Sequence, residues 1–152
     1  MDIKSKAEYP AGALSNFTSY PFEIDGIQCA SMEGFLQSLK TADPTEQITI
    51  CAIVGKAAKH WGSEHNFFWK TIQKLWWQGR ELDRHGQKYQ QLLDRAYEAL
   101  SQNEEFRKAL LATGQEILTH SIGESDPHET ILTEQEFCSR LMTIRSKLIS
   151  ED

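Results

Sequence analysis

The chain has 152 residues, enough for one ordinary domain that buries about 70% of its unfolded surface without a metal or disulfide staple. Its 39% hydrophobic and 25% charged residues are typical of a globular protein and exclude disordered, collagen-like and low-complexity chains. Sixteen Lys and Arg against 22 Asp and Glu give a net charge of -6, which disfavours general binding to nucleic-acid phosphates but leaves room for a local basic groove.

The first part of the chain predicts a hairpin followed by a short helix. Residues 20–29 alternate polar and apolar side chains around Asp25-Gly26. This dipeptide is typical of a two-residue hairpin turn, because both of its residues tolerate positive φ. Ser31 can then accept a hydrogen bond from the first turn of a helix, so we expect a helix over residues 31–40.

A second helix start lies at residues 43–46, Asp-Pro-Thr-Glu. The Asp is a capping residue, the Pro suits the first helical position and the Glu completes a capping box. We expect this helical stretch to run to about residue 60, with a break near Gly55 and with Gly62 just beyond its end.

The rest of the chain predicts a second hairpin and three helices. Residues 74–82 have the pattern of a hairpin, and residues 89–100 place apolar side chains on one helical face. Residues 104–112 predict a short helix that ends at Thr-Gly, and residues 116–119 predict a strand. A Thr-to-Glu capping box predicts a last helix over 133–148.

These elements predict an α+β fold, mostly helical with a small sheet. Because the sequence has no repeat or long linker, residues 1–152 are expected to form one domain, with residues 1–8 a loose N-terminus. No apolar stretch reaches the roughly 20 residues of a membrane span, and no secretory signal is visible, so we expect a cytoplasmic protein without a membrane partner. Cys29, Cys51 and Cys138 show no metal-ligand spacing and are interpreted as reduced core residues.

Glu33, Gln37 and Lys40 carry polar chemistry on the first predicted helix. Seven residues advance a helix by about 700°, so Glu33 and Lys40 share a face, about 10.5 Å apart in rise, with Gln37 between them. The spacing alone is more typical of a solvated polar stripe on a surface helix. Residues and spacing therefore leave both interpretations open.

An ordered set of short segments extends over nearly the whole chain. They are Leu14-Ser15-Asn16-Phe17, Pro21-Phe22, Asp25-Gly26, Glu33 with Gln37 and Lys40, Gly55-Lys56-Ala57-Ala58-Lys59 with Gly62, Phe106 to Gly114, and Arg140 to Arg145. This set resembles the NADAR family, which is named for its association with NAD and ADP-ribose metabolism. Two positions depart from the family pattern: Gly34 stands where a His often follows the Glu, and residues 121–130 lack the Trp-Gly of the family's C-terminal loop.

The resemblance implies an N-glycosidase that acts at the anomeric carbon of a ribose. Lys40 matches the family lysine held to attack this carbon and form a Schiff base, and Glu33 matches the acid that moves protons or holds ribose hydroxyls. Asp126 is the best match to a third catalytic position, an aspartate of the C-terminal loop. The implied chemistry needs no cofactor and no metal.

Lys40 can act as a nucleophile only when its amine is neutral. An ordinary lysine, with a pKa near 10.4, is neutral in only about one molecule in 2,500 at pH 7. Desolvation or nearby positive charge must therefore lower the pKa of Lys40. Because direct contact with a carboxylate would raise this pKa, we expect a ligand or water to separate Lys40 from Glu33.

Five further side chains are candidates for substrate binding. Ser15, Asn16 and Gln37 offer polar groups for sugar or phosphate oxygens, although Asn16 is also typical of a turn. Phe17 and Trp77 offer flat rings for a base, although such residues more often lie in a core.

Arg84 is a candidate phosphate clamp, with a salt bridge to a nearby carboxylate as its alternative role.

Three functions stay open for the chain. The acidic net charge favours a small ribosyl-phosphate of the kind found in riboflavin biosynthesis. Removal of ADP-ribose from guanine in DNA is the second function, and non-catalytic binding of ADP-ribose or a nucleotide is the third. A run of basic residues supports the DNA alternative: Lys56, Lys59, Lys70, Lys74 and Arg80.

Overall fold

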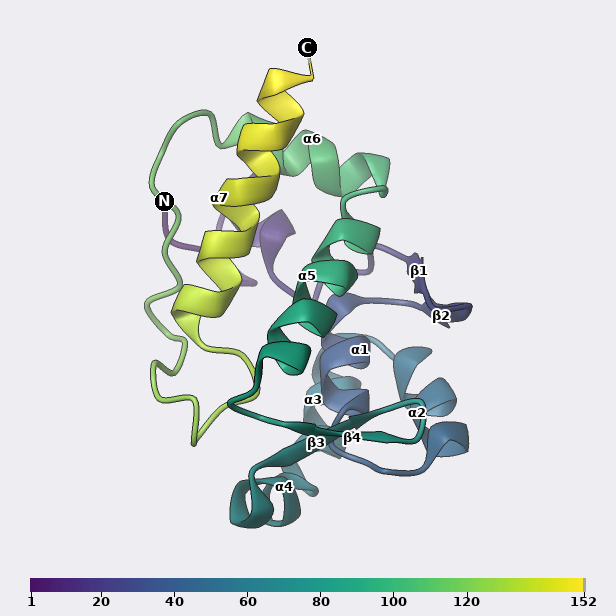
Figure 1. The fold of residues 1–152 in the computed structure, drawn as a ribbon. Coiled ribbons are helices and arrows are strands. Elements are labelled where there is room, and N and C mark those ends of the chain that lie inside the picture. The colour runs from purple at the N-terminus through teal and green to yellow at the C-terminus, as the bar shows by residue number, and fades with distance from the viewer. Residues whose placement is uncertain (152) are drawn as a thin grey trace.

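A computed structural model describes residues 1–151 as one compact domain of helices and two small antiparallel hairpins (Figure 1). Its elements are the 3-10 turn η1 (Gly12–Leu14), β1 (Phe22–Ile24), β2 (Ile27–Cys29), α1 (Met32–Ser38), α2 (Pro44–Cys51), α3 (Gly55–Ser63), α4 (Asn66–Ile72), β3 (Lys74–Trp77), β4 (Arg80–Asp83), α5 (Gln87–Leu100), α6 (Glu104–Ala112) and α7 (Glu134–Ser150). The predicted α+β class is confirmed. Within residues 1–151, no helix is both long and apolar enough to cross a membrane.

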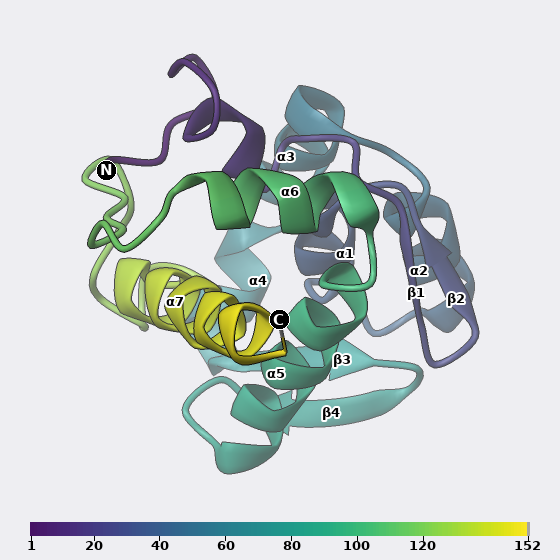
Figure 2. The ribbon, with the colours of Figure 1, turned by 90° about the horizontal axis from the view of Figure 1, so that it is seen from above.

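Helix α1 lies in the middle of the fold, and every one of its residues is buried. Helices α2 and α3 pack against it, whereas α5, α6 and α7 form a second group (Figure 2). A helix enclosed in this way cannot carry a solvated polar stripe. The polar side chains that α1 bears therefore lie inside the protein. Their burial costs free energy of desolvation, which hydrogen bonds have to offset.

The local signals for helix starts and hairpins are confirmed, except that Asp43 caps α2 without the predicted capping box, by accepting from the Thr45 N–H at 2.9 Å. Ser31 Oγ accepts a hydrogen bond from Gly34 N at 3.1 Å, and a capping box opens α7. The β1–β2 turn places Asp25 at φ 51° and Gly26 at φ 80°, the positive φ values that its dipeptide tolerates. The predicted helical break near Gly55 separates α2 from α3.

Three predictions differ from the structure. The two hairpins form separate two-stranded sheets rather than one. Residues 116–119 form no strand, because their only pairing is a single parallel bridge from Thr119 to Asp2. The N-terminus is not loose at its start: Ile3 is fully buried, and its N–H donates to the Thr119 carbonyl at 2.8 Å. Helix α4 had no counterpart among the predicted elements, because its sequence lacks an amphipathic period.

Arg84 joins the end of β4 to α7 from inside the protein. Its side chain is 1% exposed, and its guanidinium donates to both carboxylate oxygens of Glu136, at 3.1 and 2.8 Å. A third hydrogen bond, 2.9 Å long, runs to the Thr130 carbonyl. The predicted phosphate clamp is therefore wrong, and its alternative role, a salt bridge, is what the structure contains.

We expect Arg84→Leu to lower the free energy of unfolding by about 3–5 kcal/mol, because it leaves the Glu136 carboxylate without its partner. Urea unfolding followed by circular dichroism measures the change. The control Arg107→Leu removes an ion pair to Glu151 that is 3.9 Å long and solvent-exposed, so it should cost less than about 1 kcal/mol. Equal effects of the two variants would contradict a structural role for Arg84.

Candidate functional site

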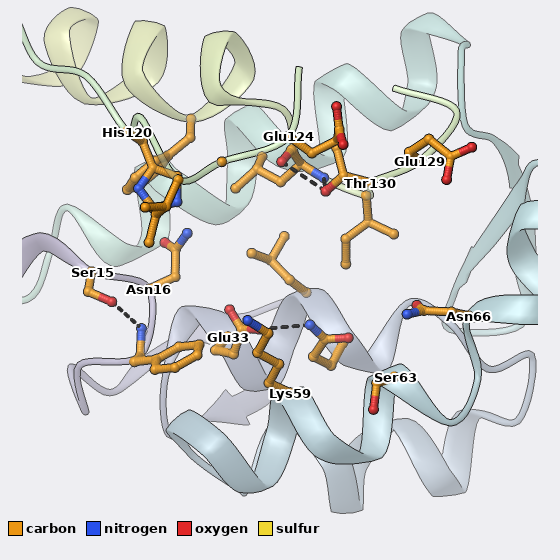
Figure 3. A pocket seen from close by; sticks show the side chains of 18 of the residues that line it. Ser15, Asn16, Glu33, Lys59, Ser63, Asn66, His120, Glu124, Glu129 and Thr130 are labelled. Atoms are coloured by element: carbon orange, nitrogen blue, oxygen red, sulfur yellow. Dashed lines mark hydrogen bonds between the residues drawn. The ribbon is translucent and has the colours of Figure 1, made fainter. Parts of the chain in front are cut away.

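A cavity of about 410 Å³ opens beside α1 (Figure 3). Residues 15–17, α1, α3 and α4 form one part of its wall, and the loop 120–132 forms the part opposite α1. Ser15, Asn16, Phe17, Glu33, Gln37 and Lys40 line it together. The structure thus brings together six of the nine side chains that the sequence predicts for the site.

The Lys40 amine is buried and has no carboxylate partner within residues 1–151. Nζ donates to Asn66 Oδ1 at 2.6 Å and to the Gly62 carbonyl at 3.3 Å, and the residue is 6% exposed. Burial is the largest cause that lowers the pKa of Lys40 to about 8. The Glu33 carboxylate opposes this shift. At pH 7 about one amine in ten is then neutral, about two hundred times the fraction of an ordinary lysine.

Two other lysines add to the shift. The positive charges of Lys70 and Lys59 both lower the pKa of Lys40. Lys59 is exposed, and its ammonium lies 5.7 Å from the centre of the Phe17 ring. Lys70 is ion-paired to Glu129 at 3.3 Å. The cavity is therefore locally basic on its α3–α4 side, within an acidic chain.

Glu33 lies one helical turn from Gln37 and is held by it. Gln37 Nε2 donates to Glu33 Oε1 at 2.7 Å, and the Glu33 N–H donates to the Asn16 carbonyl at 3.0 Å. Burial raises the pKa of the Glu33 carboxyl, and the Gln37 hydrogen bond opposes part of that shift. In the described part of the chain Glu33 and Lys40 make no ion pair. The ligand or water that the sequence analysis places between the two groups stays a prediction.

Gln37 also fixes how closely α3 approaches α1. Its Oε1 is buried without a hydrogen-bond partner in the described chain. A Cβ placed on Gly62 would lie 1.7 Å from this oxygen. Only glycine fits there, and the same residue supplies one of the two acceptors for the Lys40 amine.

Residues 15–17 approach α1 from the N-terminal side. Asn16 Oδ1 accepts a hydrogen bond from Tyr97 OH at 2.9 Å, which leaves the Asn16 amide nitrogen for a ligand. Ser15 Oγ accepts from the Phe17 N–H at 3.2 Å. Asn16 therefore does more than close a turn, because it reaches a residue 81 positions along the chain.

Three predicted site residues do not line the cavity: Trp77, Asp126 and Arg84. The Trp77 ring is buried edge-on against Phe35, with centroids 5.1 Å apart, and its Nε1 donates to Asp25 at 2.8 Å. Trp77 is thus a core residue, as its alternative interpretation proposed. Asp126 is exposed and accepts from the backbone and ring of His128. The predictions that Trp77 and Asp126 form part of this site are wrong.

The cavity residues without a counterpart among the predicted site residues include four polar ones: Asn66, His120, Glu124 and Glu129. Asn66 is the first residue of α4, a helix that the sequence pattern does not reveal. The other three lie in the loop 120–132, where the sequence departs from the family pattern. Across residues 1–151, no three His, Cys, Asp or Glu side chains lie close enough to hold a metal ion.

Fold and site together define a NADAR-type domain. The solution structure of the Escherichia coli protein YbiA matches 99% of this chain and 85% of its own, with a TM-score of 0.65 at 20% sequence identity. An uncharacterized 17.1 kDa protein of the Gp30–rIII intergenic region of enterobacteria phage T4 is 37% identical over 150 residues, which cover 97% of this chain and 98% of the phage protein. The chain belongs to the family of bacteriophage protein GP30.3, which matches residues 8–146 and is a NADAR-family domain.

The contact between Gly62 and Gln37 can be tested directly. We expect Gly62→Ala to destabilise the protein by about 1–3 kcal/mol, because the new methyl group displaces Gln37 and with it the hydrogen bond to Glu33. In the double variant Gly62→Ala/Gln37→Ala, the shorter side chain makes room for the methyl group. Thermal unfolding of the wild type, both single variants and the double variant completes the cycle. Strictly additive effects would contradict the proposed contact.

Proposed function

We propose that the protein is an N-glycosidase that cleaves the bond between a ribose phosphate and a base or amine, with Lys40 as the nucleophile. The observation that carries this proposal is the Lys40 amine, which is buried at the cavity wall, held by neutral groups and lowered in pKa to about 8. A lowered pKa adds nothing to the stability of a structural lysine, whereas a nucleophilic lysine needs it to be partly neutral. Family membership supports the same class of chemistry.

The reaction begins when the neutral Lys40 amine attacks the anomeric carbon. A bond forms between Nζ and this carbon, and the carbon–nitrogen bond to the base breaks, with its electron pair going to the base. Glu33, whose pKa is raised by burial, moves a proton from Nζ to the ring oxygen as the sugar opens to a protonated Schiff base. Addition of water then releases the sugar and restores the free amine.

The cavity volume fits a small substrate. About 410 Å³ lies at the lower end of the usual range for small-molecule sites, roughly 300–1,000 Å³. The Asn16 amide nitrogen and Lys59 offer donors to sugar hydroxyls and phosphate, and the Phe17 ring offers a face for a base. A free ribosyl-phosphate metabolite, as in riboflavin biosynthesis, is therefore the preferred substrate.

A second candidate, removal of ADP-ribose from guanine in DNA, is favoured by the outer surface of α3 and α4. Lys56 and Lys59 lie on α3, and Phe67 on α4 is 84% exposed. Exposed aromatic rings among lysines can stack on bases while the ammonium groups contact phosphates. The third candidate, a module that binds ADP-ribose without cleaving it, gives no reason for a lowered pKa at Lys40.

Borohydride trapping tests the nucleophile. We expect the wild type, incubated with a ribosylaminopyrimidine phosphate and reduced, to gain the mass of the sugar phosphate at Lys40, because reduction fixes the Schiff base. Lys40→Met should lose the adduct and slow hydrolysis by at least about 10³-fold. Lys108→Met, on the exposed surface of α6, is the matched control and should behave as wild type.

A parallel incubation with ADP-ribosylated guanine in DNA separates the substrates, since an adduct formed only there would support the second candidate. Ligand binding without turnover by the wild type, with Lys40→Met altering affinity alone, would instead support the binding module and contradict the glycosidase.

The pH dependence of the rate follows from the lowered pKa of Lys40. Because only the neutral amine attacks, kcat/KM on a substrate whose leaving group needs no proton, such as a phosphorylated ribosylpyridinium, should rise about tenfold per pH unit from pH 6 and level off near pH 8. A lysine with an ordinary pKa would keep the rate rising to about pH 10. Initial rates across pH 6–10 measure the profile, and a rate that still rises between pH 9 and pH 10 would contradict the proposed environment of Lys40.

A further inference from the structure

His120 lies on the cavity wall across from Glu33, on the loop that follows α6 (Figure 3). Its ring is half-buried and packs edge-on against Phe137, with centroids 5.5 Å apart and planes at 82°. Its backbone N–H donates to Glu134 Oε2 at 2.6 Å. Both the ring and the backbone of His120 are thus fixed, although the residue belongs to a loop.

The hydrogen bond at Nδ1 fixes the tautomer of His120. Nδ1 lies 2.7 Å from the carbonyl oxygen of Ile3, which can only accept a hydrogen bond. Nδ1 therefore carries a hydrogen in either charge state of the ring. Nε2 is the nitrogen that gains and loses a proton, and it has no hydrogen-bond partner in the described part of the chain.

Backbone pairing holds this acceptor in place. The Ile3 N–H donates to the Thr119 carbonyl at 2.8 Å, and the Thr119 N–H donates to the Met1 carbonyl at 2.9 Å. Ile3 itself is fully buried. The first three residues thus form a support for the ring of His120, next to it in space although about 117 positions away in sequence.

We propose that His120 is a further catalytic residue, which donates the Nε2 proton to the nitrogen of the leaving base. This inference rests on the proposed glycosidase function. The site needs such a donor because the base leaves with an electron pair, and an unprotonated base nitrogen is a poor leaving group. Glu33 is committed elsewhere, since Gln37 holds it beside Lys40, on the other side of the cavity.

The proton balance closes over one turnover. In the first step Lys40 Nζ bonds to the anomeric carbon, the carbon–nitrogen bond breaks, and the proton of the His120 imidazolium moves to the departing nitrogen. Glu33 moves a proton from Nζ to the ring oxygen in the second step. In the third step water adds to the Schiff base, the amine departs neutral, and the proton lost by water returns to His120.

Substrates that differ only in their leaving group test this role. A ribosylaminopyrimidine phosphate needs a proton on its leaving nitrogen, whereas a phosphorylated ribosylpyridinium expels a neutral pyridine and needs none. We expect His120→Asn, whose amide can still donate to the Ile3 carbonyl, to lose about 10²-fold or more in kcat on the first substrate and little on the second. His120→Gly should regain turnover of the first substrate when imidazole is added.

The control is His85→Asn, which removes a histidine outside the cavity and should leave both rates unchanged. Circular dichroism checks folding, and His120→Gln replaces any variant that fails to fold. Equal losses on both substrates, or no loss on either, would overturn the assignment of His120 while leaving Lys40 as the nucleophile. If the wild type cleaves neither substrate, the glycosidase proposal fails and the role of His120 fails with it.

Discussion

The burial of the Lys40 amine constrains the rest of this structure. A buried ammonium without a counter-ion costs free energy, so a fold usually exposes such a group, pairs it with a carboxylate or replaces it. Here the amine instead faces the amide oxygen of Asn66 and the carbonyl of Gly62, both neutral acceptors. These groups satisfy the hydrogens of the amine without stabilising its charge as a carboxylate would. The burial that costs folding free energy therefore also makes the Lys40 amine more nucleophilic.

Gln37 and Gly62 keep the Lys40 amine on neutral acceptors and away from the Glu33 carboxylate. α1 is buried and faces the cavity on one side only, so both Glu33 and Lys40 lie in a poorly solvated region, and close contact between them would form a stable ion pair. Gln37 keeps the carboxyl occupied, and Gly62 lets α3 approach closely enough for its carbonyl to reach Nζ. A side chain at position 62 or a shorter one at position 37 would disturb the same arrangement. Packing and chemistry thus depend on one contact between two helices.

Local signals in the sequence predict the helix starts, the hairpin turns and the polar face of α1, because caps, Asp-Gly turns and helical spacing act over a few residues. They do not reveal which side of an element faces the cavity. Trp77 and Arg84 lie on or beside the second hairpin, and their residue types suit both core and ligand contacts. Their burial depends on Phe35 and Glu136, which are 42 and 52 positions away.

Asn66 and His120 illustrate a second limit. Asn66 reaches Lys40 from a seven-residue helix whose aromatic run, Phe67 and Phe68, faces solvent, so no periodic pattern marks the helix. His120 owes its fixed tautomer to the carbonyl of Ile3, a contact between the two halves of the chain. Such long-range contacts leave no trace in local spacing, although they decide which side chains meet.

Burial and nearby positive charge both lower the pKa of Lys40, but they do not contribute equally. Burial contributes most, and the nearby ammonium groups of Lys70 and Lys59 contribute less. Lys70 is paired with Glu129 at 3.3 Å near the surface, where salt and water screen its charge. The reactivity of the Lys40 amine therefore comes mainly from the enclosed helix α1 and not from the basic surface around it. An acidic protein can in this way lower the pKa of a lysine without a strongly basic active site.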